Sequence, residues 1–165
     1  MWGDGMSIER IIPTDWSRST TSSDHSNITN YENALTNTDS TTYGYFFYAG
    51  SGYSYLKFNA SGLPSAMSSV SFKIKAVRAG GTSLTVSTAV EHDGTTYESE
   101  TVSISDTLAT YDLPLPSGVT LSQLRSATAI YIKVHVSSTQ INVYGAEMDA
   151  DTTAYKIFNL ILPRG

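Results

Sequence analysis

The stretch YSYLKFNASGLPSAMSSVSFKIKAV, residues 53–77, decides the fold. Leu56 and Phe58 alternate with Tyr55 and Lys57, so one side of this segment is apolar. A Ser-rich segment with Gly and Pro then interrupts the pattern, and apolar residues again alternate with Ser and Lys over residues 70–76. A spacing of two is the period of a β-strand, whereas a helix needs spacings of three and four. The stretch therefore predicts two half-buried strands that a second sheet must cover.

The rest of the chain shows the same strand-like alternation of apolar and polar residues. Further strands are expected at residues 43–48, 83–91, 97–103, 109–113, 129–137, 141–147 and 155–162. The Gly-containing connection at residues 49–52 predicts a hairpin, and Ser137-Ser138 is expected to be a turn. Residues 120–125 could form one helical turn capped by Thr120 or Ser122. The sequence thus predicts an all-β fold, an antiparallel two-sheet β-sandwich.

The alternation also predicts which side chains form the core. The expected core residues are Val70, Phe72, Ile74, Leu84, Val86, Ile130, Ile132 and Val134, and the side chains expected to point outward are Lys73, Lys75 and Lys133.

Both ends of the chain differ from this pattern. Residues 1–42 are rich in Ser, Thr, Asn and Asp and predict a long irregular N-terminal arm, packed on the sandwich of residues 43–165 or on a partner. A short helical turn is possible near residues 28–35. The segment Tyr155–Leu162 is apolar on both faces, which is typical of a strand covered by a neighbouring subunit. The expected assembly contacts are Trp2, Ile8, Ile11, Trp16, Phe158 and Leu160.

The composition excludes several classes of function. The 165 residues include no Cys, so disulfides and thiolate metal sites are impossible. The net charge of −5 argues against a nucleic-acid partner. No apolar run approaches the roughly 20 residues that span a bilayer, and no signal peptide is recognised at the N-terminus. Charged residues make up 15% of the chain beside 24 Ser and 21 Thr, which suits strands with hydroxyl-rich outer faces.

No catalytic motif is present. The nucleophile-elbow pattern Gly-x-Ser-x-Gly and the zinc pattern His-Glu-x-x-His do not occur, and His25, His92 and His135 are far apart. A pair of carboxylates assembled by folding carries no short-range pattern, so a glycosidase stays open as a minor alternative. We expect the chain not to be an enzyme.

Two other groups of residues could bind something. Glu147, Asp149 and Asp151 alternate and could converge on Ca²⁺ from a strand end, although a solvated acidic turn is the preferred interpretation and no cofactor is expected. The aromatic residues expected to contact a glycan or a protein partner are Tyr43, Tyr45, Phe47, Tyr53 and Tyr55.

The opening stretch also carries a resemblance to a known group of proteins. The run from Tyr55 to Pro64, followed by the run from Ser69 to Ile74, resembles the strand–Ser-Gly-Leu-Pro–strand pattern of jelly-roll carbohydrate-binding-type modules. Similar modules occur in secreted polysaccharide-active proteins and in virion proteins of tailed bacteriophages. The resemblance implies a jelly-roll topology, and such modules often hold a structural calcium ion.

Together these observations give three functional hypotheses. The first is a non-enzymatic structural or accessory component of a bacteriophage particle, capsid-decorating or tail-associated. We expect it to be homo-oligomeric or bound to a coat or tail protein, with a host-surface glycan as a further candidate partner and no nucleic-acid or membrane partner. Its expected location is the virion, after assembly in the host cytoplasm. The alternative is a stand-alone, extracellular carbohydrate-binding module of a secreted bacterial protein. The third is a jelly-roll glycan-cleaving enzyme.

Overall fold

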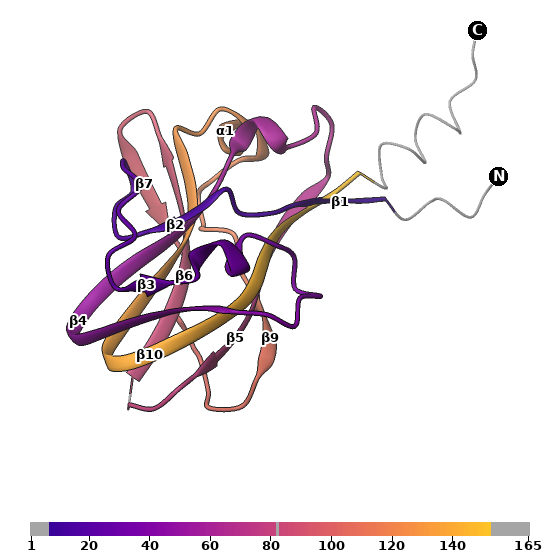
Figure 1. Cartoon of the computed structure of the whole chain (residues 1–165). Helices are drawn as coiled ribbons and strands as arrows, with labels where there is room; N and C mark the ends of the chain where they lie inside the picture. The colour runs from indigo at the N-terminus through magenta and orange to yellow at the C-terminus, as the bar shows by residue number, and fades with distance from the viewer. Residues whose placement is uncertain (1–6, 82, 153–165) are drawn as a thin grey trace, which may run out of the picture.

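The computed structural model describes residues 7–81 and 83–152 (Figure 1). The strands are β1 (Ile8–Ile11), β2 (Asp15–Ser17), β3 (Ile28–Thr29), β4 (Gly44–Phe58), β5 (Ser69–Arg78), β6 (Ser83–His92), β7 (Thr95–Glu98), β8 (Val102–Ser103), β9 (Ala109–Leu113) and β10 (Ala129–Asp151). The helical elements are the 3-10 helices η2 (Tyr31–Ala34) and η3 (Ala60–Gly62) and the α-helix α1 (Leu121–Arg125). Among these residues no helix is both long enough and apolar enough to cross a membrane.

The long strands β4 and β10 organise the molecule. They pair with each other from Ile130 opposite Phe58 to Val143 opposite Gly44. Both strands bend at the same corner, where the register shifts between Ser137 and Thr139 (Figure 1). Ser138 has a positive φ of 49° there, and its hydroxyl donates a hydrogen bond of 2.7 Å to the carbonyl oxygen of Ala49.

Two sequence predictions about this corner are wrong. Residues 49–52 do not close a hairpin, because the segments on both sides of them belong to β4 and pair with β10. Ser137 and Ser138 likewise lie within one strand instead of separating two. Gly52 is required at the bend, since a Cβ at this position would lie 2.7 Å from the Tyr48 ring.

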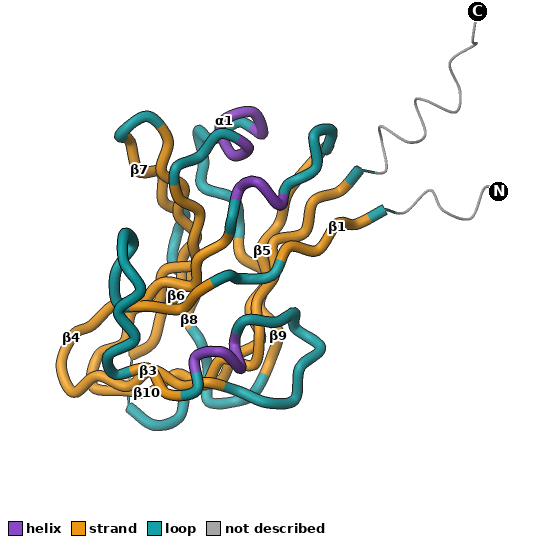
Figure 2. The backbone as a smooth tube through the Cα atoms, turned by 45° about the horizontal axis from the view of Figure 1, so that its top comes forward, coloured by secondary structure: helices purple, strands orange, loops and turns teal. Residues whose placement is uncertain are grey.

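The corner divides the antiparallel sheet into two layers (Figure 2). Layer one contains β2, residues 51–58 of β4, residues 129–137 of β10, and β6 with β7 and β8 at its edge. Layer two contains β3, residues 44–48 of β4, residues 139–151 of β10, β5, β9 and β1. The predicted antiparallel two-sheet β-sandwich is confirmed.

The core fills the space between the layers. The predicted core residues, from Val70 to Val134, are all buried in one hydrophobic cluster. Phe58 of layer one meets Phe72 of layer two edge to face, with ring centroids 5.8 Å apart. Lys73, Lys75 and Lys133 stay partly exposed, so the predicted register is confirmed.

The N-terminal segment is part of the sandwich. Strand β1 pairs with β10, whereas β2 and β3 pair with β4, so residues 8–29 are tied to the sheet at three places. Trp16 is fully buried, and its indole N–H donates a hydrogen bond of 2.9 Å to the Ser54 hydroxyl. Of the two roles expected for Trp16, a contact with a partner or packing on its own sandwich, the structure shows the second, because its own core surrounds the side chain.

The other predicted assembly contacts divide into two groups. Ile11 packs against the core, whereas Ile8 is 46% exposed. Trp2, Phe158 and Leu160, together with the predicted strand Tyr155–Leu162, lie outside the described residues.

Helix α1 begins at the predicted cap. The Thr120 hydroxyl accepts a hydrogen bond from the backbone N–H of Gln123, and the Gln123 side chain accepts one from the backbone N–H of Thr120. This reciprocal pair satisfies two backbone donors that the helix leaves free. The helical turn predicted for residues 120–125 is confirmed.

Candidate functional site

The outer face of layer one gathers aromatic and polar side chains in register. His135 of β10 lies between Tyr53 of β4 and Thr85 of β6, and Lys133 is paired with Ser87 in the next outward-facing row. These residues alternate with core residues along each strand, so their side chains point away from the core.

A pocket of about 120 Å³ lies on this face, and we call it the Tyr53 pocket. Its lining consists of Tyr53, Thr85, Val86, Ser87, Glu98, Thr101, Lys133 and His135. Tyr53 is 40% exposed, so part of the residue is accessible to a ligand.

The Tyr53 ring is held in place by its neighbours. The imidazole of His135 stacks on it with centroids 4.6 Å apart and an interplanar angle of 19°. The ammonium of Lys133 lies 4.8 Å from the ring centroid, close enough for a cation–π contact. The Nε of Arg18 donates a hydrogen bond of 2.9 Å to the Tyr53 carbonyl oxygen, which fixes the backbone. The ring is therefore pre-organised before any ligand arrives.

The polar groups of the pocket are also ordered. Glu98 accepts hydrogen bonds from Lys133 at 3.3 Å and from the Ser87 hydroxyl at 2.8 Å. His135 Nε2 and the Ser51 hydroxyl share a hydrogen bond of 2.7 Å. Because Lys133 and Glu98 neutralise each other, the pocket offers hydrogen-bonding groups without a large net charge.

Two further Tyr residues extend this face along β4 and β10. Tyr55 and Tyr131 meet edge to face with centroids 5.2 Å apart, and the Tyr131 hydroxyl donates a hydrogen bond of 3.2 Å to Glu91. Burial, followed by the negative charge of Glu91, raises the pKa of Tyr131 well above its usual value of 10. Its phenol therefore stays a neutral hydrogen-bond donor.

A second pocket, of about 270 Å³, lies where β4 ends and β10 begins. It is lined by Thr14, Thr20, Lys57, Phe58, Asn59, Ala60, Ala127, Thr128, Ala129 and Ile130. Lys57 is the charged residue of this lining, and its ammonium is not free. It donates a hydrogen bond of 2.8 Å to the Ser22 carbonyl oxygen and lies 3.5 Å from a carboxylate oxygen of Asp15.

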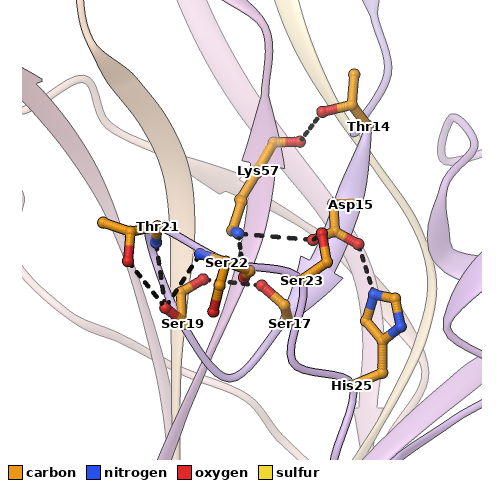
Figure 3. A network of polar contacts seen from close by, with 9 residues as sticks. All are labelled: Thr14, Asp15, Ser17, Ser19, Thr21, Ser22, Ser23, His25 and Lys57. Atoms are coloured by element: carbon orange, nitrogen blue, oxygen red, sulfur yellow. Dashed lines mark hydrogen bonds and ion pairs between the residues drawn. The ribbon is translucent and has the colours of Figure 1, made fainter.

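Asp15 is the centre of the polar network that anchors the loop after β2 (Figure 3). One of its oxygens lies 2.7 Å from His25 Nε2, and the other accepts a hydrogen bond of 3.1 Å from the Ser23 hydroxyl. His25 in turn stacks on Tyr31, with centroids 3.6 Å apart. Ser23 and His25 both bind Asp15, so the three residues do not form the Ser–His–Asp chain of a hydrolase.

The surroundings of Asp15 change its pKa. Partial burial alone raises the pKa, but the hydrogen bonds from His25 and Ser23 and the nearby charges of His25 and Lys57 outweigh burial. The pKa of Asp15 consequently lies below its usual value of 3.8. The carboxylate is thus a stable anchor for the loop at neutral pH.

The structure divides the predicted aromatic contacts between two faces. Tyr53 and Tyr55 lie on the outer face of layer one, whereas Tyr43, Tyr45 and Phe47 precede the corner and lie on layer two. Sequence analysis missed the partners of Tyr53, which are His135, Lys133, Thr85, Ser87 and Glu98. The outward positions of His135, Lys133, Thr85 and Ser87 follow from the alternation in β6 and β10, whereas Glu98 lies on β7. The proximity of all five to Tyr53 depends on strand order.

The predicted metal ligands lie on the outer side of β10 in layer two. The preferred interpretation of a solvated acidic turn is wrong, because Glu147 and Asp149 are within the strand and are 1% and 7% exposed. Arg10 lies 3.5 Å from Glu147, and Lys73 lies 3.6 Å from Asp149. No group of three or more His, Cys, Asp or Glu that could hold a metal ion occurs among the residues described, Asp151 included.

Comparisons with known proteins give only loose structural matches. No family model and no curated protein matches the sequence. One similar structure is a mutant of a family 29 carbohydrate-binding module in complex with mannohexaose. The two sequences are 14% identical, the match covers 96% of this chain and 99% of that chain, and the TM-score is 0.42. Another is a family 4 carbohydrate-binding module, with 16% identity, 67% and 76% covered, and a TM-score of 0.35. Because these scores are low, ligand binding has to be argued from the side chains of this chain.

Proposed function

We propose that this protein is a carbohydrate-binding module whose ligand lies against Tyr53. One observation carries the proposal. Tyr53 is partly exposed on a β-sheet face, its ring is fixed by His135 and Lys133, and it borders a pocket lined with hydroxyl and carboxylate groups.

A sugar ring can contact both the aromatic ring of Tyr53 and the polar groups of the pocket beside it. The C–H groups of a pyranose pack on the face of an aromatic ring, and its hydroxyls need donors and acceptors beside that ring. The carboxylate of Glu98 can accept from a sugar hydroxyl, and the hydroxyls of Thr85 and Thr101 can donate or accept. An apolar surface with a few convergent polar groups is the usual form of a small-ligand site.

The charges favour an uncharged sugar. Lys133 is the ammonium group of the pocket, and it is already paired with Glu98. An anionic sugar would have to displace that carboxylate or lie close to it, which would cost binding free energy. We therefore expect neutral polysaccharides to bind more tightly than uronates. Such ligands lie outside cells, so the proposed place of work is extracellular.

The proposal is tested by isothermal titration with soluble neutral polysaccharides (hydroxyethyl cellulose, galactomannan and arabinoxylan) and with polygalacturonate. In Tyr53→Ala, the loss of an aromatic contact worth about 1.5–3 kcal/mol should weaken binding at this face by about tenfold or more. Tyr53→Phe keeps the ring and is the matched control, so it should retain most of the affinity. An unchanged affinity in Tyr53→Ala, or tighter binding of polygalacturonate than of every neutral probe, would contradict the proposal.

The other two hypotheses stay predictions. No observation on the described residues favours a virion role over other roles. For a glycan-cleaving enzyme, the nearest carboxylates on this face are Glu98 and Glu91. Each already accepts hydrogen bonds from neighbouring side chains, Glu98 from Ser87 and Lys133 and Glu91 from Tyr131.

A further inference from the structure

A second aromatic surface lies on the outer face of layer two, and we call it the Phe47 strip. It consists of Tyr43, Tyr45, Phe47, Gln140, Asn142 and Tyr144. Tyr45 and Phe47 alternate along the start of β4, and Tyr43 directly precedes the strand. Beside them, two amides and one aromatic residue alternate along β10. The strip is separate from the Tyr53 pocket, because the corner of β4 and β10 lies between them.

The register sets each amide beside a ring. Asn142 lies opposite Tyr45, and Gln140 lies opposite Phe47. Directly opposite residues of an antiparallel pair have their Cβ atoms about 4.5–5.5 Å apart, so ring and amide are adjacent on the surface. Next to these two rows, the rings of Tyr43, which precedes β4, and Tyr144 of β10 lie 5.0 Å apart. The rows from residue 43 to residue 47 span about 13 Å along the strand.

Two rings of the strip are exposed to solvent. Phe47 is 45% exposed and Tyr43 is 40% exposed, whereas Tyr45 and Tyr144 are partly buried and Phe46 is completely buried. Two large apolar groups that remain exposed on one face indicate a contact surface better than a single exposed ring does.

The amides are oriented and still have hydrogen-bonding capacity. The Nε2 of Gln140 donates a hydrogen bond of 2.8 Å to Oδ1 of Asn142, which holds the two side chains together. Within the described part of the chain, the remaining acceptor of Gln140 and the remaining donor of Asn142 make no hydrogen bond. The strip thus offers the free amide oxygen of Gln140 and the free amide nitrogen of Asn142 next to two rings.

No member of the strip is charged. The nearest cation is Lys75, which donates a hydrogen bond of 2.9 Å to the Ser40 carbonyl oxygen and lies 5.6 Å from the Tyr144 ring centroid. A ligand that combines C–H faces with hydroxyls, and that carries no charge, matches rings set beside amides. We propose that the Phe47 strip is a second carbohydrate-binding site for neutral sugar chains, on the opposite side of the sandwich from the Tyr53 pocket.

Two sites on opposite faces would let one chain hold two polysaccharide strands. Binding at the first site then raises the effective concentration of sugar at the second, so apparent affinity for a dense polysaccharide exceeds that of either site alone. This inference goes beyond the proposed function and does not rest on it, since the strip shares no residue with the Tyr53 pocket.

The test compares Phe47→Ala, Tyr53→Ala, the double variant and the unchanged protein in titrations with hydroxyethyl cellulose, galactomannan and arabinoxylan. Phe47→Tyr is the matched control, because it keeps a ring, and Gln140→Ala removes the amide. Phe47 is half exposed, so we expect Phe47→Ala to fold, and urea unfolding of each variant checks this.

The proposal predicts that Tyr53→Ala keeps a binding site that is lost in the double variant. It also predicts that Gln140→Ala weakens that site whereas Phe47→Tyr preserves it. Binding lost completely in Tyr53→Ala and unchanged in Phe47→Ala would overturn the second site and leave the proposed function intact. Binding lost only in Phe47→Ala would support the strip and contradict the proposed function. Self-association in sedimentation that Phe47→Ala abolishes, without loss of any sugar site, would show that the strip is a protein interface and overturn the proposal.

Discussion

The two outer faces of the sandwich each carry an ion pair, and the two pairs differ in their exposure to solvent. On layer one, the side chains of Lys133 and Glu98 are 27% and 38% exposed, and the pair borders an open ring. On layer two, the side chain of Glu147 is only 2% exposed beside Arg10. Lys133 and Glu147 both occupy outward positions of β10, so alternation along the strand does not distinguish an open, candidate binding position from a covered, structural one.

The difference in exposure comes from the segments that cover β10. Thr38 donates a hydrogen bond of 2.9 Å to Glu147, and the Ala146 N–H donates one of 2.9 Å to the Thr36 carbonyl oxygen. Gly145 permits this approach, because a Cβ there would lie 2.0 Å from the Asn37 carbonyl oxygen. The segment after η2 thus covers the part of layer two around Glu147, whereas the Tyr53 pocket stays open. The comparison teaches that the covering loops decide which outward side chains are free to bind.

The largest effect should come from truncating a ring in the core. Phe72 is fully buried, so Phe72→Ala should lower the free energy of unfolding by about 3–5 kcal/mol through lost burial and a cavity. Tyr53→Ala, at an open position, should change it by about 1 kcal/mol or less. Urea denaturation measures both values. Equal losses in the free energy of unfolding would contradict the view that Tyr53 contributes to binding and not to the stability of the fold.

A smaller loss of stability should distinguish the two ion pairs. In Arg10→Ala, the buried Glu147 loses its cation and keeps an oxygen without a hydrogen-bond partner, which should cost about 1–3 kcal/mol. Lys133→Ala removes an exposed partner and should cost about 0–1 kcal/mol. The same denaturation experiment checks both. If Lys133→Ala proved the more destabilising change, the contrast between the two faces would be wrong.

The smallest expected effect is a pH dependence of the stability that arises from Asp15, which anchors the loop after β2 on layer one. The folded-state pKa of Asp15 lies below its unfolded value of 3.8, so its ionised form stabilises the fold above that value. The contribution is lost as the pH falls through the lower, folded-state pKa. Asp15→Asn should therefore be less stable than the unchanged protein near neutral pH, and the difference should shrink below the unfolded pKa. Thermal unfolding over this range measures it, and a difference that grows at low pH would contradict the assignment.

Much of the fold could be predicted from the sequence because strand alternation is a local property. The apolar positions of residues 70–76 and 130–136 fixed the core register, and the cap at Thr120 marked the helix start. The corner was not predictable in the same way. Gly50 and Gly52 look like a hairpin signal, and only the pairing of both flanking segments with β10 shows that they bend a single strand.

The candidate site was predictable only in part. Tyr53 stood out as an aromatic residue on an outward position. His135 and Glu98 come from distant parts of the chain, and their meeting depends on β10 lying between β4 and β6. The acidic residues Glu147 and Asp149 looked solvated in the sequence, because nothing local shows that Thr38 contacts Glu147 or that Asp149 lies between β1 and β5. Their two cations come from β1 and β5, which only the sheet order brings near.

The most direct test of the central claim is to map sugar contacts on the intact protein by NMR. Amide and side-chain signals of a ¹⁵N- and ¹³C-labelled sample are followed during titration with neutral oligosaccharides. The account predicts that the largest shifts fall on Tyr53, Lys133, His135 and their neighbours on β6, with a second set at Phe47 and Asn142. Shifts confined to the covered face around Glu147, or no shifts at all with neutral sugars, would contradict it.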